Sequence, residues 1–150
     1  ELVGVRYGGD KAIMSFGTTG STKTNLISNL GVVGSDVTQV GTARTAPGAA
    51  TYGNDKAAIA YGSGMTNLKN LVSNVGVVGS DVTGVGTARN SIAGVGYGGD
   101  KGAFAYGTTG GTSYVSLKNL LSNSGVIASD VTGVGTARAT LASAGFSLSA

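Results

Sequence analysis

The chain has 150 residues, of which 41% are hydrophobic and only 11% charged, and it contains 28 glycines but a single proline. Cysteine and histidine are absent, which excludes disulfides, thiolate metal sites and histidine-based acid–base chemistry. The formal net charge of +3 is spread along the chain without interleaved aromatic residues, so we expect no nucleic-acid partner. No apolar run reaches the length of a bilayer span, and we therefore expect a soluble protein with no membrane partner.

One phrase of sequence recurs three times. A Tyr-Gly-x-Asp-Lys turn begins at Tyr7, Tyr52 and Tyr97, at intervals of 45 residues. A fixed period of this length is typical of repeat proteins, whose units bury apolar surface by stacking on one another. We divide the chain into units of about 1–44, 45–89 and 90–138. Residues 139–150 match the first strand of a further unit, with Phe146 aligned to Tyr97.

Each unit begins with a short apolar strand, such as residues 92–97, followed by a Gly/Asp cluster typical of a tight hairpin turn. The second strand is predicted over residues 57–61 and the equivalent positions of the other units. Alternation along it places Ile59 and Tyr61 on one face and alanines on the other. A strand without a polar face is buried on both sides, which favours sheets stacked face to face.

The third strand is predicted over residues 25–29, 70–74 and 119–123. A helix is the alternative for these segments, and we favour strand because Asn and Ser bracket each one and a glycine follows almost at once. The fourth strand is Thr/Val-rich and begins at an aspartate in each unit. The third unit is the longest, and its extra residues fall within 107–114, which we place in the loop between its second and third strands.

Four short strands per unit predict one blade of a β-propeller. The order of phrases is Arg, a small apolar strand, Tyr-Gly-x-Asp-Lys, an apolar strand ending in Gly, an Asn-rich third strand and Ala-Arg. This order resembles the kelch repeat of β-propellers and is similar to the Gly-rich kelch-like repeats of phage and environmental viral proteins. The resemblance covers nearly the whole chain. It implies a viral, virion-associated protein or an engineered derivative of such repeats.

Three blades are too few for a ring, because propellers need about four to eight. We therefore expect an all-β propeller with three four-stranded blades per chain, closed by homo-oligomerisation. The simplest assembly is a head-to-tail homodimer of six blades, in which residues 139–150 clasp the first blade of the partner subunit. A chain cut from a longer propeller is the other explanation of an incomplete ring. The alternative folds are a β-trefoil and a β-prism, which close as monomers.

The repeats carry three sets of charged residues at fixed places. They are the turn aspartates Asp10, Asp55 and Asp100, the strand-opening aspartates Asp36, Asp81 and Asp130, and the junction arginines Arg44, Arg89 and Arg138. The turn aspartates either bind a ligand at a ring entrance or shape the hairpin turn, and we favour the turn. The strand-opening aspartates either begin a strand or contribute to a Ca²⁺ site, but only Ser and Thr are near them to add ligands. The junction arginines either grip anions or satisfy carbonyls and an aspartate between blades, which we favour.

No nucleophile has a base beside it, so the sequence predicts a protein that is not an enzyme and has no cofactor and no metal. We expect a structural or recognition module that assembles with copies of itself. It would contact a protein surface through the loops that differ between units, at residues 17–22, 62–66 and 107–114. The alternative is a carbohydrate-binding lectin with one glycan site per blade, built from Tyr and Asp.

Overall fold

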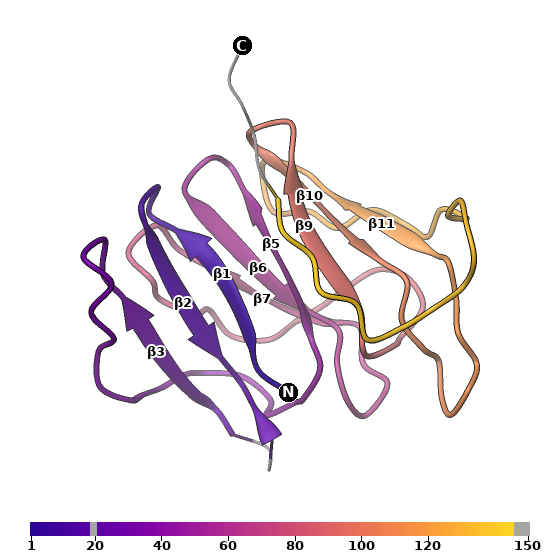
Figure 1. Cartoon of the computed structure of the whole chain (residues 1–150), viewed down its shortest axis with the longest axis horizontal. Coiled ribbons are helices and arrows are strands. Elements are labelled where there is room, and N and C mark those ends of the chain that lie inside the picture. The colour runs from indigo at the N-terminus through magenta and orange to yellow at the C-terminus, as the bar shows by residue number, and fades with distance from the viewer. Residues whose placement is uncertain (19–20, 146–150) are drawn as a thin grey trace.

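A computed structural model describes residues 1–18 and 21–145 of the chain. Within them, eleven strands form three separate antiparallel sheets, one for each sequence unit, with no closed barrel of the trefoil kind. The sheets stand side by side in chain order (Figure 1). The chain is therefore all-β, and its sheets are arranged like neighbouring blades of a propeller.

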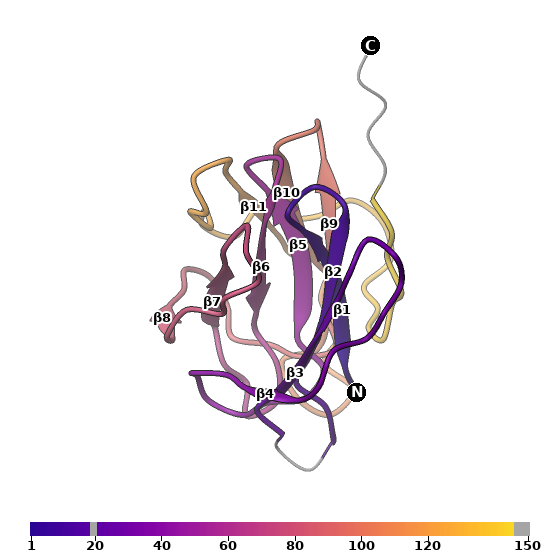
Figure 2. The same cartoon turned by 90° about the vertical axis from the view of Figure 1, so that its left-hand side faces the viewer.

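Each sheet is a simple meander, in which strands that are consecutive in sequence are hydrogen-bonded neighbours. The first sheet contains β1 (Val3–Tyr7), β2 (Lys11–Ser15), β3 (Lys23–Ile27) and β4 (Val37–Thr38). The second contains β5 (Gly48–Tyr52), β6 (Lys56–Ala60), β7 (Leu68–Val72) and β8 (Val82–Thr83), and Figure 2 shows these four in order from the inner to the outer edge. The third contains β9 (Ala93–Tyr97), β10 (Lys101–Ala105) and β11 (Lys118–Leu121), and a bridge between Lys118 and Val131 takes the place of its fourth strand.

The third strand of each unit is a strand, as predicted, but it begins and ends earlier in the chain. In the first unit β3 ends at Ile27, because Ser28 opens a turn. Its hydroxyl oxygen accepts hydrogen bonds from the amides of Leu30 and Val32. Gly31 completes this turn with a φ of 77°, a left-handed conformation that glycine adopts at little cost. The Ser-Asn pair is therefore turn rather than strand.

The core lies between the sheets rather than within any one of them. The first and second sheets share a buried cluster that includes Ile13, Ile59 and Val72. The second and third sheets share another, in which Ala58 and Ala60 lie with Phe104. Strand β6 contributes to both clusters. The prediction of a second strand buried on both faces is thus confirmed for the middle unit.

The faces of that strand differ from the prediction in one respect. Ile59 belongs to the cluster shared with the first sheet, whereas Tyr61 packs toward the third sheet, with its ring centroid 5.7 Å from that of Phe104. The prediction that both large residues share a face is wrong, because β6 ends at Ala60 and Tyr61 has a φ of 64°. Phe16 and Tyr106, at the same place in their units, have the same positive φ.

A repeated backbone hydrogen bond joins, from sheet to sheet, the residues that lie just before the inner strands. The donor and acceptor pairs are Ala46 N to Glu1 O (3.4 Å), Ser91 N to Ala46 O (3.1 Å) and Thr140 N to Ser91 O (3.0 Å). Residues 139–145 therefore lie beside β9, in yellow in Figure 1, and Ser143 donates from its hydroxyl to Gly94 O. This is the place that the inner strand of a fourth sheet would take. Phe146, on which the sequence alignment of this segment rests, lies outside the described residues.

No helix among the described residues is long and apolar enough to cross a membrane.

Candidate functional site

The most distinctive polar groups of the molecule are the junction arginines. Arg44 and Arg89 each end one sequence unit, and both side chains are fully buried between two sheets. A buried guanidinium is costly unless its donors and its charge are matched by the protein. The surroundings of these two residues therefore decide what the junctions can do.

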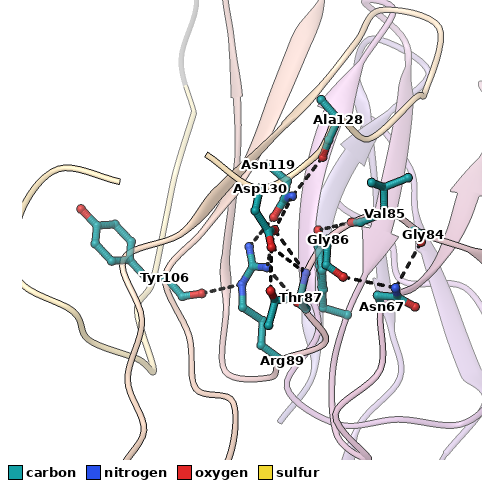
Figure 3. Close-up of polar contacts among 11 residues, drawn as sticks. Asn67, Gly84, Val85, Gly86, Thr87, Arg89, Tyr106, Asn119, Ala128 and Asp130 are labelled. Atoms are coloured by element: carbon teal, nitrogen blue, oxygen red, sulfur yellow. Dashed lines mark hydrogen bonds and ion pairs between the residues drawn. The ribbon is translucent and has the colours of Figure 1, made fainter. Parts of the chain in front are cut away.

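Arg89 is held mainly by polar groups of the third sheet (Figure 3). Its Nε donates to Tyr106 O at 2.9 Å, and its Nη2 donates to Asn119 Oδ1 at 2.6 Å. Its Nη1 donates to Thr87 O at 3.0 Å and lies 3.8 Å from Asp130 Oδ1. A planar fork of donors suits such a set of fixed acceptors better than a lysine ammonium does.

The other face of each guanidinium lies on an aromatic ring of the preceding sheet. The central carbon of Arg89 is 4.5 Å from the centroid of the Tyr61 ring, and that of Arg44 is 4.4 Å from the Phe16 ring. These are cation–π distances. Each arginine thus stacks on one sheet and hydrogen-bonds to the next.

Burial raises the pKa of Tyr61 to about 12, so its hydroxyl is neutral and donates to Val85 O.

Arg44 contacts the asparagine and the aspartate at the same places in the second sheet. It donates to Asn70 Oδ1, Ile59 O and Thr42 O, and its Nη1 lies 3.7 Å from Asp81 Oδ1. Its Nε differs from that of Arg89, because it is a buried donor with no partner among the described residues. Burial lowers the pKa of Arg44 to about 10 against the opposing effect of Asp81, so the side chain is still charged at neutral pH.

The strand-opening aspartates are the counter-charges of these arginines. Asp81 accepts from the backbone amide and hydroxyl of Thr42 at 2.8 and 2.6 Å and from Asn70 Nδ2 at 2.9 Å. Burial raises the pKa of Asp81, but these hydrogen bonds and the charge of Arg44 outweigh it, so the pKa lies below its usual value. Asp130 is held in the same way by Thr87 and Asn119, with the same direction of shift.

The third arginine and the first strand-opening aspartate have only half of this environment. Arg138 is exposed, and it stacks on Tyr106 at 4.2 Å and donates to Thr136 O at 3.2 Å. Asp36 is also exposed, and it accepts from Asn25 Nδ2 at 2.9 Å. Arg138 belongs to the outer side of the third sheet and Asp36 to the outer side of the first.

The turn aspartates lie apart from the arginines, at the hairpins that join the first and second strands of the sheets. Each pairs with the lysine that follows it, at 3.9 Å for Asp10, 3.3 Å for Asp55 and 3.1 Å for Asp100, and all three pairs are solvent-accessible. The backbone oxygens of Asp55 and Asp100 link neighbouring sheets, since Gly8 N donates to Asp55 O and Gly53 N donates to Asp100 O at 2.7 Å each. The turn role favoured from the sequence stays a prediction.

The role of the junction asparagines was not predicted from the sequence. Asn25, Asn70 and Asn119 each stand eleven residues before a strand-opening aspartate, and each donates to it. That fixed spacing in all three units was the available signal. The threonine two residues before each junction arginine was a second signal, because Thr42 and Thr87 bind the aspartate of the next sheet.

In comparisons with protein-family models and with curated protein sequences, nothing matches the chain. Solved structures do match it. One is a novel fungal alcohol oxidase of the AA5 family in complex with copper, with a TM-score of 0.54 and 12% sequence identity. The match covers 83% of this chain, which spans only 31% of the length of the oxidase chain. At this identity the likeness shows a shared fold and nothing further.

The match corrects the prediction that the chain is not an enzyme. That prediction was inferred from missing residue types, and it is wrong because a protein of the same fold is an oxidase. The likeness assigns no reaction to this chain. Copper favours nitrogen and sulfur ligands, and the chain has no histidine and no cysteine. Among the described residues, no three of the residue types His, Cys, Asp and Glu lie close enough to hold a metal ion.

Proposed function

We propose that the chain is a kelch-like propeller unit that pairs head to tail with a second copy, so that two chains make a six-bladed recognition module. The observation that supports this proposal is a consistent difference between repeats. Positions that are buried at the two internal junctions are exposed on the two outer sheet faces. We name these faces the exit face, on the third sheet, and the entry face, on the first sheet.

The exit face exposes an aromatic residue that is buried in the other units. Tyr7 and Tyr52 are 3% and 5% exposed, whereas Tyr97 at the same position is 39% exposed. Tyr7 packs against Gly76 of the second sheet, and Tyr52 packs against Gly125 of the third. Tyr97 occupies the same position in the third sheet, but no further sheet among the described residues packs against it. An additional sheet on the exit face would bury it.

The entry face exposes the complementary apolar residues. Val33 is 59% exposed, whereas its equivalents Val78 and Ile127 are 8% and 2% exposed. Met14 is 44% exposed, whereas Ile59 at the same position is fully buried. Val78 and Ile59 lie in the cluster with Tyr7. An entry face placed on the exit face of another copy would therefore repeat the contacts of an internal junction.

The inner strand of the new junction has two candidates. Residues 139–145 already lie beside β9, where β1 of a partner subunit would have to lie. Only one strand can lie at this position, so residues 139–145 and β1 of the partner subunit would exchange places. Either residues 139–145 replace β1 on the partner's β2, or β1 stays and residues 139–145 leave.

Recognition is assigned to the loops that differ between units. Residues 107–114 form the longest of the three, and Tyr114 in it is 50% exposed. Thr108 anchors this loop through backbone hydrogen bonds with Asn90. The lectin alternative is less well supported, because two of the three repeated turn tyrosines are buried at junctions rather than available to stack on sugars. A glycan array in which binding scales with the number of blades would favour the lectin instead.

The test of the proposal is the mass of the chain in solution. Sedimentation equilibrium over a wide concentration range should give a species of twice the 14.5 kDa chain mass. Higher open oligomers would retain the junction but contradict the closed pair. A single species of 14.5 kDa at every concentration would contradict the proposal as a whole.

A further inference from the structure

We infer that a pocket on the entry face, beside Asn25 and Asp36, binds the guanidinium of Arg138 from a second copy of the chain. The inference rests on the proposed head-to-tail pairing and names the side chains that join the two copies. It is carried by two filled examples of the same pocket within the chain. In each of them an arginine meets an asparagine and an aspartate of the following sheet.

The acceptor half of the pocket is already formed. Asn25 Nδ2 donates to Gly34 O at 3.1 Å and to Asp36 Oδ1 at 2.9 Å. Asn70 makes the same two bonds, to Gly79 O and Asp81 Oδ1, at 2.9 Å each. In the filled pocket these bonds direct the carbonyl oxygen of the asparagine to the arginine. The bonds of Asn25 fix its side chain in the same way, so its carbonyl oxygen is ready to accept a guanidinium.

The space for the guanidinium of Arg138 is also present. A hollow of about 380 Å³ opens beside Asn25 and Asp36, with Met14 and Leu2 in its apolar lining. Lys23 also lines the hollow, but its ammonium donates to Thr38 Oγ1 at 2.9 Å on the neighbouring strand. The carboxylate of Asp36 supplies the charge that a guanidinium needs.

The donor half is formed on the exit face. Arg138 stacks on Tyr106 at 4.2 Å, as Arg89 stacks on Tyr61 at 4.5 Å. Its Nη1 donates to Thr136 O at 3.2 Å, as that of Arg89 donates to Thr87 O at 3.0 Å. The side chain is therefore held in the pose of a filled junction before any partner arrives. A preformed donor and a preformed acceptor lower the entropic cost of association.

The two halves lie on the first and third sheets, at opposite ends of the row of sheets in Figure 1. A second copy supplies each half with its match, and a closed pair contains two such contacts. Thr136 follows the pattern of Thr42 and Thr87, so its hydroxyl would donate to Asp36 of the other copy. The proposed contact therefore joins the exit face of one copy to the entry face of the other.

The experiment measures the dimer dissociation constant of single variants by sedimentation. Arg138→Ala and Asp36→Ala should each weaken the dimer at least about 100-fold, because each removes one member of a buried charge pair at both junctions. Lys56→Ala is the charge-matched control, because Lys56 lies on the middle sheet and pairs with Asp55. It should leave the dimer within about threefold of the unmodified chain. Circular dichroism checks that each variant is folded.

A mixture of the two variants gives the sharper readout. A heterodimer of Arg138→Ala and Asp36→Ala chains has one complete contact, whereas each homodimer has none. Native mass spectrometry should therefore show the heterodimer in clear excess over the statistical proportion. A dimer that is as tight in Arg138→Ala as in the unmodified chain would overturn this inference and leave the proposed pairing intact. An unmodified chain that stays monomeric would overturn both.

Discussion

A buried arginine is tolerated between two sheets because both internal junctions surround its guanidinium with the same kinds of group. An aromatic ring lies on one side, and an asparagine, an aspartate and backbone oxygens lie on the other. The arginine contacts both sheets at once, so it fixes the position of one sheet relative to the next. Lysine would lose the stacked plane and most of the forked hydrogen bonds.

The repeats provide a matched test of this role. Arg89→Ala leaves Asp130 and Asn119 without their buried partner and should lower the free energy of unfolding by about 3–5 kcal/mol. Arg138→Ala changes the same residue type in the same motif, but at an exposed position, and should cost less than about 1 kcal/mol. Urea unfolding at a concentration where the chain is monomeric measures both. Equal losses would contradict the assignment.

The junction aspartates predict an acid limit to stability. The pKa of Asp130 is lowered in the folded chain, so its contribution is fully present above the unfolded value of about 3.9 and is lost as pH falls through the folded value. Asp130→Asn should therefore destabilise the chain more at pH 7 than at pH 3, as measured by urea unfolding at both values. An equal effect at the two values would show that its ionisation contributes nothing.

The sequence was a good guide to which residues recur and a poor guide to what they touch. The fixed place of Arg44 and Arg89 at the ends of units predicted a junction role. Their stacking on Phe16 and Tyr61 could not be foreseen, because it depends on a positive φ at each aromatic residue. Strand alternation assumes an extended backbone up to the last residue, and these strands end one residue earlier.

At the scale of the strand, the second strand determines how closely the sheets approach. Ala58 and Ala60 are fully buried, and they leave space for Phe104 of the third sheet. Small residues on one face and large ones on the other allow two sheets to interdigitate.

The predicted order of four strands agrees with the structure in every unit up to the outer edge of the third sheet. There, a single bridge at Val131 replaces a fourth strand.

Equivalent alanines test this packing. Ala58→Leu adds volume between two sheets and should cost about 1–3 kcal/mol of unfolding free energy. Ala103→Leu makes the same change on the exit face, where the residue is only partly buried, and should cost clearly less in the monomer. It should instead weaken the dimer. Thermal or urea unfolding and sedimentation measure the two effects, and a reversed order would contradict the stacked arrangement.

The proposed exchange of inner strands between two copies predicts a result from truncation. A chain without residues 139–150 keeps β1 for the new junction, and a chain without residues 1–7 keeps the clasp, so each should still dimerise. A chain without either segment has no inner strand for that position and should lose the dimer. Sedimentation velocity of the three folded proteins measures this. A single truncation that abolishes the dimer would show that the two strands are not equivalent.

The whole molecule is a row of three similar sheets with two unlike ends. Repetition alone made the blade-like units predictable, and the structure agrees in fold with part of a much longer oxidase chain. The sequence could not reveal which surface stays open, because identical motifs are buried in one unit and exposed in another. Tyr97 and Val33 show this difference most clearly. Unlike, complementary ends favour head-to-tail contacts, which close into a ring when the rotation permits.

Cross-linking between single-cysteine variants tests the head-to-tail claim most directly, because the chain has no cysteine of its own. Val33→Cys marks the entry face and Tyr97→Cys marks the exit face. With a short bismaleimide, a mixture of the two variants should give a covalent dimer, whereas each variant alone should give little. Efficient cross-linking of Val33→Cys to itself, or none in the mixture, would contradict the pairing of unlike faces.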